Sequence, residues 1–332
     1  MRTGIADLPL HGGKAPPWLF GRMVKLGRAI AEVIIEEYGT EEFLSRLSHP
    51  YWFQSLSMVL GFDWHSSGTT TVTMGALKEA LGPDLGIVVA GGKGKVSRKT
   101  PEEIVKLGDE LGLGTRKLED LVKTSRLSAK VDNACVQDGY QLYHHTIIFD
   151  EKGNWTVIQQ GMNSRWARRY HWFNADDFLN DPQLVAGQKR EKDVMNLASS
   201  ESSEARDVVL DLAKDGTRLE MPRKANWKAL KAVYEIQPRN FEELLLVRGI
   251  GPSTLRALAL ISDVVFGKPP SYKDPIRYAF AVGGKDGVPF PVDKRAMDEA
   301  TLTLKEAIEM AKLGKKERMN ALRRLSYKLN IS

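Results

Sequence analysis

Two glycines set between two apolar runs most constrain how the last third of this 332-residue chain can fold. The segment from Phe241 to Ile261 reads FEELLLVRGIGPSTLRALALI, so Gly249 and Gly251 flank a single isoleucine and Pro252 follows at once. Glycine tolerates the positive φ that a tight turn requires, and proline favours the first turn of a helix. The segment therefore predicts two helices joined by a short turn, with Ile250 anchoring the turn in the core.

The start of the second helix is a candidate phosphate site. Its free N–H groups and the positive end of its dipole favour an anion. The segment resembles the helix-hairpin-helix of DNA repair glycosylases, polymerases, ligases and nucleases, which implies contacts with the nucleic-acid backbone and not with base sequence. A plain αα-hairpin, or a protein-binding form of the motif, is the alternative. The phosphate-binding residues expected here are Arg248, Gly249, Gly251, Ser253, Thr254 and Arg256.

The positive charge of the chain is concentrated in the same region. The whole chain has 48 Lys and Arg against 42 Asp and Glu. Residues 217–332 hold 22 of those cations and 13 of those acids, which leaves 26 cations against 29 acids for residues 1–216. Between Lys312 and Lys328 seven cations accompany one acid, which predicts a basic helical face that either contacts nucleic acid or is simply solvated. We expect DNA as the partner, double- or single-stranded, with RNA and a homodimer left open.

Hydrophobic periodicity predicts an α+β fold in two domains. We expect residues 1–180 to form a mixed α/β domain with a β-hairpin, and residues 207–332 to form an all-α helix-hairpin-helix domain. The stretch from 174 to 206 loses its periodicity and is rich in serine, so residues 181–206 are expected to be a linker. Before the linker, helices are expected over 16–38, 40–47, 50–60, 74–81, 100–111 and 115–133, and a buried strand over 85–90. After it, helices are expected over 227–236, 241–247, 252–266 and 294–329, the last in one or two pieces.

The β-hairpin is predicted together with its register. Runs over 140–149 and 155–160 are rich in strand-forming residues and are separated by the five-residue loop DEKGN. With that loop, His145 faces Gln159 and His144 faces Gln160. A buried polar pair is costly unless it is hydrogen-bonded. These pairs are therefore interpreted either as part of an active site or as a structural network.

Carboxylates and imidazoles gather before and within this hairpin. The run GFDWHSSGTTT surrounds Asp63 and His65 with five hydroxyl side chains, which indicates a binding role or hydroxyl-rich turns. A divalent metal, Mg²⁺ or Mn²⁺, held by Asp132, Asp138 and His145 could activate water against a phosphodiester, and a structural hydrogen-bond network is the alternative. The candidate catalytic residues are Asp63, His65, Asp132, Asp138, His144 and His145.

Two further basic segments are candidates for phosphate contact. Lys93 and Lys95 belong to the sequence GGKGK, whose backbone N–H groups and ammonium charges suit a phosphate. The spacings of a Walker loop and of a dinucleotide-binding loop are absent, so no nucleotide cofactor is expected. Arg165, Arg168 and Arg169 alternate with aromatic residues, a mix that grips phosphates and stacks unpaired bases. The same alternation also suits a strand that packs into a core.

Over most of its length the chain resembles a prokaryotic, largely archaeal family, the domain of unknown function 763, which implies no catalytic residues. The segments that carry this resemblance are LPLHGGKAPPWLFGRM, GFDWHSSGTTT, VDNACVQDGYQLYHH, VIQQGMN, ARRYHW and AFAVGGKDGVPFPVD. In glycosylases of the helix-hairpin-helix class, a P-V-D segment after the hairpin carries the catalytic aspartate. Asp293 takes that place here, where it could equally be the N-cap of a following helix.

Three functions follow from these patterns. The leading hypothesis is a DNA-processing or repair nuclease that uses a divalent metal. The alternatives are a DNA glycosylase that uses Asp293, and a nucleic-acid-binding protein without catalysis. The single cysteine, Cys135, excludes a disulfide scaffold, and no apolar run approaches the roughly 20 residues of a membrane span. A soluble, cytoplasmic protein is therefore expected.

Overall fold

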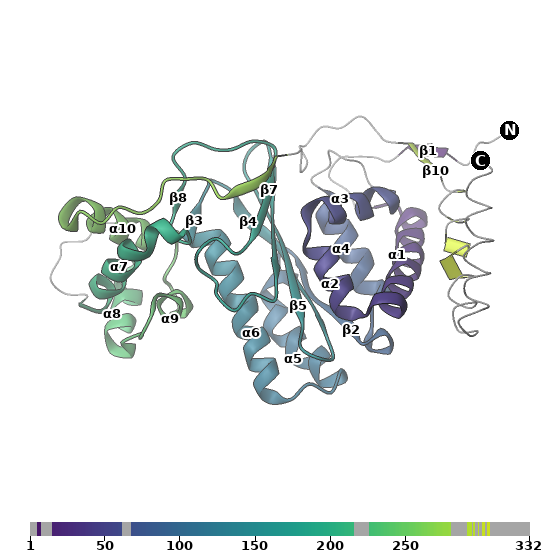
Figure 1. Cartoon of the computed structure of the whole chain (residues 1–332), viewed down its shortest axis with the longest axis horizontal. Coiled ribbons are helices and arrows are strands. Elements are labelled where there is room, and N and C mark those ends of the chain that lie inside the picture. Colours follow the sequence, from purple (N-terminus) through teal and green to yellow (C-terminus); the bar gives the residue numbers. More distant parts are fainter. Residues whose placement is uncertain are drawn as a thin grey trace.

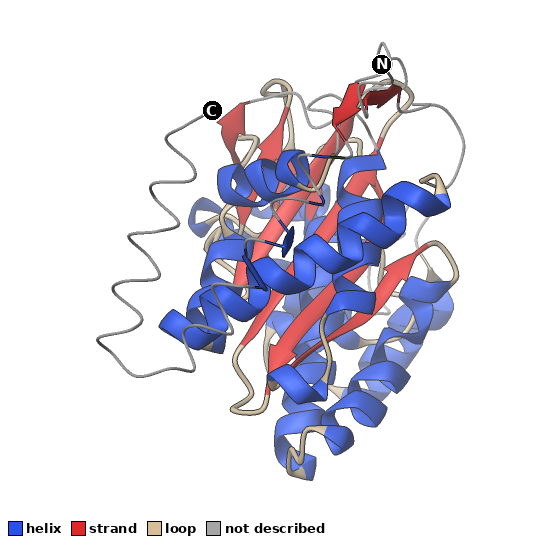
Figure 2. Cartoon of the chain, turned by 90° about the vertical axis from the view of Figure 1, so that its right-hand side faces the viewer, coloured by secondary structure: helices blue, strands red, loops and turns tan. Residues whose placement is uncertain are grey.

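The computed structural model describes residues 5–7, 15–61, 68–215, 226–279 and 291–293, with a few positions between 295 and 305. A six-stranded sheet in the order β2-β4-β5-β6-β7-β9 crosses the middle of these residues (Figures 1 and 2). Neighbouring strands are antiparallel except β7 and β9, which are parallel. The strands are β2 (Ile87–Lys93), β4 (Gln141–Asp150), β5 (Trp155–Met162), β6 (Ala167–Phe173), β7 (Leu184–Gly187) and β9 (Ile276–Ala279).

The central hairpin of β4 and β5 forms in the predicted register. His145 pairs with Gln159, and His144 pairs with Gln160. The loop is closed by Asp150, whose carboxylate accepts two backbone N–H groups of the loop, both at 2.9 Å. Since strand side chains alternate between the two faces of a sheet, His144 and Gln160 lie on one face, and His145 and Gln159 lie on the other.

Four helices cover the face that carries His144, on the right in Figure 1. They are α1 (Pro17–Tyr38), α2 (Thr40–Ser48), α3 (Pro50–Val59) and α4 (Gly68–Ala80). Their apolar side chains pack against Ile148 and Ile158 of the sheet. The first three helices agree with the predictions. The fourth begins at Gly68 and not near residue 74. Its first turns bury hydroxyl side chains in place of apolar ones, so hydrophobic periodicity does not detect them; the Thr73 hydroxyl, for example, is hydrogen-bonded to α3.

Two helices, α5 and α6, cover the opposite face of the sheet. Four more helices, α7 to α10, lie beyond α6, on the left in Figure 1. These helices are α5 (Thr100–Glu110), α6 (Thr115–Lys130), α7 (Ser203–Asp215), α8 (Trp227–Ile236), α9 (Phe241–Leu246) and α10 (Pro252–Phe266). A π-helical turn over Val131–Cys135 follows α6, and β3 (Val136–Gln137) then pairs with β8 (Met195–Asn196). One continuous apolar core runs from Ile147 in the sheet to Leu258 in α10.

The serine-rich stretch is folded, which corrects the expectation that residues 181–206 form a linker. β7 lies within the sheet, and the side chain of Ser199 caps the turn that leads into α7. Ser202 and Arg206 are buried, and the Arg206 guanidinium donates to the Leu197 carbonyl at 3.0 Å. The stretch lacks an apolar period because polar side chains such as Ser202 and Arg206 occupy buried positions and form local hydrogen bonds there. The division of the chain into two domains stays a prediction.

The region after residue 206 is mixed and not all-α, which corrects the fold expected for it. β9 pairs in parallel with β7, with Ile276 opposite Val185. β10 (Pro291–Asp293) pairs with β1 (Ile5–Asp7) at the other end of the chain. A strand whose partner lies some 90 residues away leaves no local pattern, so periodicity did not predict it.

Several predicted features fall outside the described residues. Asp63, His65 and the basic run from Lys312 to Lys328 belong to this group. Asp293 lies in β10 opposite Ile5, but its side chain is outside the described part. Among the described residues, no helix is both long and apolar enough to cross a bilayer.

Candidate functional site

The turn between α9 and α10 has the conformation that its glycines predict. Gly249 has a φ of +95°, and a Cβ atom there would lie 2.9 Å from Asn226 Nδ2 and 3.0 Å from Ala229 Cβ. Ile250 is buried and anchors the turn in the core. Asn226 also caps α8 and donates from Nδ2 to the Gly249 carbonyl at 3.2 Å. This packing leaves no room for a larger residue at Gly249.

The start of α10 presents donors and cations at the surface. Gly251 is the N-cap residue, and Ser253 in the first turn is exposed. Arg248 and Arg256 are exposed on either side of this start. Thr254 is buried, and its hydroxyl accepts the backbone N–H of Asn226 at 3.2 Å, which corrects the expectation that it contacts phosphate.

This turn rests against the end of α6. The Lys130 ammonium donates to the Ile250 carbonyl, and Gln137 Nε2 donates to the Pro252 carbonyl at 2.9 Å. Arg256 Nε donates back to Gln137 Oε1 at 2.6 Å. These contacts use carbonyl groups of the turn, while the Ile250 N–H donates to the Val247 carbonyl at 3.2 Å within the turn itself. The turn is thus held in a fixed orientation.

Two cavities lie beside the turn and share a wall. One of about 300 Å³ is lined by Pro252 and Arg256 from α10. The other, of about 410 Å³, is lined by the cations Arg98, Arg126 and Lys130, by Leu246 at the end of α9, and by polar groups of the sheet. The residues that line both cavities are Asn133 and Gln141. The two cavities therefore adjoin, with Asn133 and Gln141 between the start of α10 and the larger cavity.

Ser125 and His145 line the larger cavity and are hydrogen-bonded to each other. Ser125 Oγ lies 2.7 Å from His145 Nε2, and His145 Nδ1 lies 2.8 Å from Gln159 Oε1. The Gln159 amide donates to Asp132. Because Gln159 Oε1 can only accept, His145 carries its proton on Nδ1, and Nε2 accepts the Ser125 hydroxyl. Burial lowers the pKa of His145 to about 4, so the ring is neutral near pH 7.

Asp132 ends this chain of hydrogen bonds deep in the core. Its Oδ2 accepts both Gln159 Nε2 and the indole N–H of Trp172, the latter at 2.7 Å. Burial raises the pKa of Asp132 well above its ordinary range, and its Oδ1 has no hydrogen-bond partner among the described residues. Oδ2 thus accepts two donors, and the Gln159 amide turns its nitrogen to Asp132 and its oxygen to His145.

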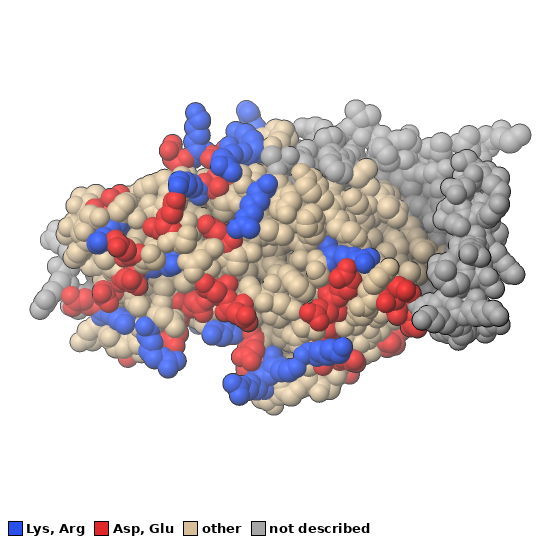
Figure 3. Space-filling view, viewed as in Figure 1, with Lys and Arg blue, Asp and Glu red and all other residues tan. Residues whose placement is uncertain are grey.

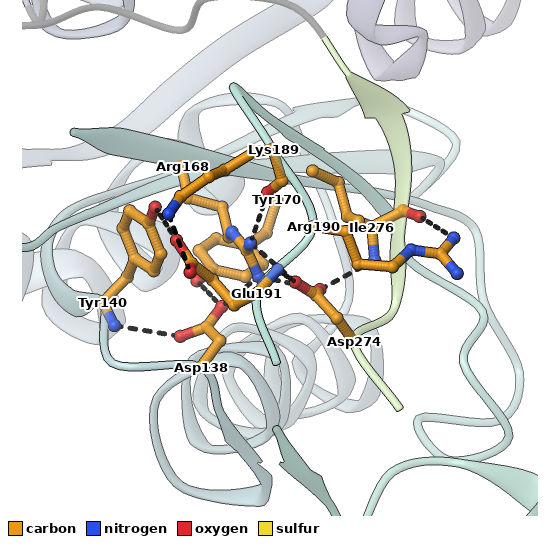
Figure 4. Close-up of polar contacts among 9 residues, drawn as sticks. All are labelled: Asp138, Tyr140, Arg168, Tyr170, Lys189, Arg190, Glu191, Asp274 and Ile276. Atoms are coloured by element: carbon orange, nitrogen blue, oxygen red, sulfur yellow. Dashed lines mark hydrogen bonds and ion pairs between the residues drawn. The ribbon is translucent and has the colours of Figure 1, made fainter. Parts of the chain in front are cut away.

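Arg168 is fully buried within a second polar cluster (Figure 4). Its guanidinium donates to Asp138 at 3.0 Å and to Asp274 at 2.8 and 2.9 Å, and its carbon centre stacks 4.6 Å from the Tyr140 ring. Burial alone lowers the pKa of Arg168, but the two carboxylates more than offset this, so the pKa is raised. A phosphate cannot reach this group, which corrects the expected nucleic-acid contact of Arg168.

Asp138 belongs to the same cluster and does not line the larger cavity. It accepts the Tyr170 hydroxyl at 2.6 Å and the Tyr140 backbone N–H at 3.0 Å in addition to Arg168. Burial raises the pKa of Asp138, while Arg168 and Tyr170 oppose that rise. The structure thus assigns Asp138 a structural contact and separates it from His145. No group of three His, Cys, Asp or Glu side chains in the described part is arranged to hold a metal, and metal use stays a prediction.

A third polar cluster lies on the other face of the sheet. Arg169 donates to Thr70 at 3.0 Å and to Gln54 at 2.7 Å, and it lies 4.5 Å from the Phe53 ring. His144 is beside it, and neither ring nitrogen has a hydrogen-bond partner among the described residues. Burial lowers the pKa of His144 to about 3. Arg169 is fully buried and cannot reach nucleic acid, so the expectation that it does is also wrong.

The remaining basic candidates are exposed. Lys93 ends β2 and lies 5.8 Å from the Tyr143 ring, and Lys95 follows in the next turn. Arg165 is exposed in the turn between β5 and β6. Over the face drawn in Figure 3, Lys and Arg are interspersed with Asp and Glu, so that face lacks a large field of one sign.

Sequence reasoning missed Ser125 altogether. Its signal was available, because Leu118, Leu121, Ser125 and Ser128 are spaced by three or four residues along the buried stripe of α6. Asp132 continues this spacing into the π-helical turn. Polar residues at positions that periodicity assigns to the core indicate a buried network.

Comparison with known proteins places the chain in one family. The chain belongs to the family described as protein of unknown function (DUF763), whose model matches residues 4–292. No curated protein and no solved structure matches the chain.

Proposed function

We propose that this member of the DUF763 family binds nucleic acid through its phosphate backbone and cleaves a phosphodiester bond held in the larger cavity. The observation that carries this proposal is the adjacency of the α9–α10 turn and the cavity. Lys130 lines the cavity and also holds the Ile250 carbonyl of the turn. One nucleic-acid strand can therefore be held at the turn while a neighbouring phosphate enters the cavity.

Charge and backbone geometry support the same assignment. At the start of α10, a phosphate would meet the first-turn N–H groups and the exposed Ser253, with Arg248 and Arg256 beside them. In the cavity it would meet the cations of Arg98, Arg126 and Lys130. Both places recognise phosphate oxygens and not base edges, so binding is expected to be insensitive to sequence.

A charge reversal at the turn tests the binding half of this proposal. Ser253→Glu puts a carboxylate in the first turn of α10, where the helix dipole favours it and folding is preserved. The same carboxylate would repel a phosphate. We expect affinity for short DNA, measured by fluorescence anisotropy, to fall roughly tenfold or more, with the slope of log affinity against log salt reduced by about 1.

The matched control is Ser203→Glu, an exposed serine at the start of α7, which lies away from the cavity. This variant should bind within about twofold of the wild type, since its new charge is far from the site and is screened. No binding at low salt, affinity that does not weaken with salt, or equal losses in both variants would contradict the proposal.

Labelled single-stranded, duplex and flapped DNA, and RNA, test the cleavage half. Each is incubated with Mg²⁺, with Mn²⁺ or with EDTA, and products are resolved on denaturing gels. Strand breaks would support a hydrolase, and their loss in EDTA would support the metal use predicted from the sequence. Breaks that appear only after alkali would support the glycosylase hypothesis. Retention of DNA without any product would leave a binding protein.

A further inference from the structure

The larger cavity contains a hydroxyl, an imidazole and an amide in the order that nucleophilic catalysis requires. Ser125 Oγ is 2.7 Å from His145 Nε2, and His145 Nδ1 is 2.8 Å from Gln159 Oε1. A nucleophile, a base within hydrogen-bond reach and a third group that orients the base define the geometry of an activated serine. We propose that Ser125 is a catalytic nucleophile, with His145 as its general base and Gln159 and Asp132 as positioning residues.

The position of each group supports this role over simple packing. Ser125 and His145 come from α6 and β4, and both line the cavity although they are nearly buried. A serine inside a helix usually either points to solvent or bonds to a carbonyl one turn earlier. Ser128 does so, donating to the Thr124 carbonyl at 2.9 Å, whereas Ser125 is directed to the imidazole.

The hydrogen bonds around His145 select the tautomer that a general base for Ser125 requires. Trp172 and Gln159 both donate to Asp132 Oδ2, and the acceptor oxygen of Gln159 faces His145 Nδ1. The imidazole proton is thereby held on Nδ1, and Nε2 is free to take the serine proton. Near pH 7 the ring is neutral, as a general base must be.

The cations of the cavity wall determine the class of substrate. Arg98, Arg126 and Lys130 line the same cavity, which favours an anionic ester, namely a phosphodiester, over a neutral acyl ester. This part of the inference rests on the proposed function. In the first step Ser125 Oγ bonds to phosphorus, its proton passes to His145 Nε2, and the P–O bond to the leaving alcohol breaks as that oxygen takes the proton. In the second step water attacks the phosphoserine, His145 takes its proton, and Ser125 leaves with that proton restored.

A fluorophosphonate probe tests the nucleophile without any nucleic acid. The serine oxygen would bond to phosphorus, fluoride would leave, and His145 would accept the serine proton. Mass spectrometry of the full chain should show one adduct, and peptide mapping should place it on Ser125. Ser125→Ala should lose the adduct, and His145→Gln should slow labelling about 100-fold, the usual size of a general-base contribution.

The control variant is Ser128→Ala, which removes a hydroxyl one turn away on the same helix and should label at the wild-type rate. Thermal unfolding checks that all variants are folded. For the wild type, the labelling rate should be constant from about pH 6 to pH 8 and fall below about pH 4, as His145 becomes protonated. No adduct, an adduct on another residue, or an unchanged rate in His145→Gln would overturn the assignment of Ser125.

Two small esters separate the nucleophile from its substrate class. Bis(p-nitrophenyl) phosphate should be hydrolysed, and p-nitrophenyl acetate should be a poorer substrate. Labelling of Ser125 together with hydrolysis of the acetate alone would overturn the phosphodiester class. Absence of labelling in a protein that still binds DNA would overturn the catalytic serine and leave the binding proposal standing. Labelling in a protein that fails to bind DNA would contradict the binding proposal and uphold the serine.

Discussion

Removal of the Arg168 guanidinium should lower the free energy of unfolding far more than removal of any surface cation. The variant Arg168→Met keeps the length of the side chain but leaves Asp138 and Asp274 buried without a counter-charge. Breaking a buried ion pair from one side costs about 3–5 kcal/mol, because the remaining charge has been removed from water. We expect a loss of this size in the free energy of unfolding, measured by urea denaturation at pH 7.5.

The pH dependence of that loss follows from the position of Asp138. In the native protein, burial raises the pKa of Asp138 and Arg168 opposes the rise. Without Arg168 the folded-state pKa rises further above its unfolded value. A group of this kind contributes stability below its unfolded pKa and loses it as pH rises through the folded pKa. The deficit of Arg168→Met should therefore be larger at pH 8 than at pH 5.

The adjacent strand position provides the control. Arg169 is equally buried, but its hydrogen-bond partners among the described residues are the neutral side chains of Thr70 and Gln54. Arg169→Met should therefore show a much weaker pH dependence. Neutralising both carboxylates in Arg168→Met, with Asp138→Asn and Asp274→Asn, should recover part of the lost stability. A deficit below about 1 kcal/mol, or equal pH dependence in the two methionine variants, would refute this reasoning.

Three further predictions concern other sites. Gly249→Ala should lower the free energy of unfolding by about 1–3 kcal/mol, because its φ is +95° and the new Cβ would contact α8. Gly251→Ala, where a Cβ meets no neighbour, should stay within about 0.5 kcal/mol of the wild type, and urea denaturation measures both variants. Burial raises the pKa of the Cys135 thiol, so iodoacetamide should modify it only in urea, and rapid native alkylation seen by mass spectrometry would contradict its burial. Trp172→Phe should cost about 1–3 kcal/mol in thermal unfolding, since it leaves the Asp132 carboxyl with one fewer donor; a change below about 0.5 kcal/mol would count against that hydrogen bond.

Local patterns predicted the local parts of the fold. The register of the β4–β5 hairpin followed from one loop length and was confirmed for the His145–Gln159 and His144–Gln160 pairs. Most helices were predicted because each buries an apolar stripe that repeats every three to four residues. The pairing of β9 with β7 was missed, since it depends on contacts between segments that are far apart in the chain.

The candidate site was only partly predictable for a different reason. Arg168 and Arg169 alternate with aromatic residues, which is a pattern shared by nucleic-acid surfaces and by buried strands. The choice depends on Asp274, which lies more than a hundred residues later and neutralises Arg168 in the core. His145 was identified from its strand register, whereas its partner Ser125 comes from another element. Sequence patterns indicate which polar groups are buried but not which of them meet.

The parallel pairing of β7 and β9 has a consequence for synthesis of the chain. β7 ends at Gly187, and β9 begins at Ile276, about 90 residues later; at 5–20 residues per second a ribosome needs about 4–18 s to produce the intervening segment. Throughout that interval β7 has an open hydrogen-bonding edge, and Arg168 lacks the carboxylate of Asp274. The sheet and its buried charge are therefore completed together, late in translation, and a chain truncated before Asp274 should be aggregation-prone.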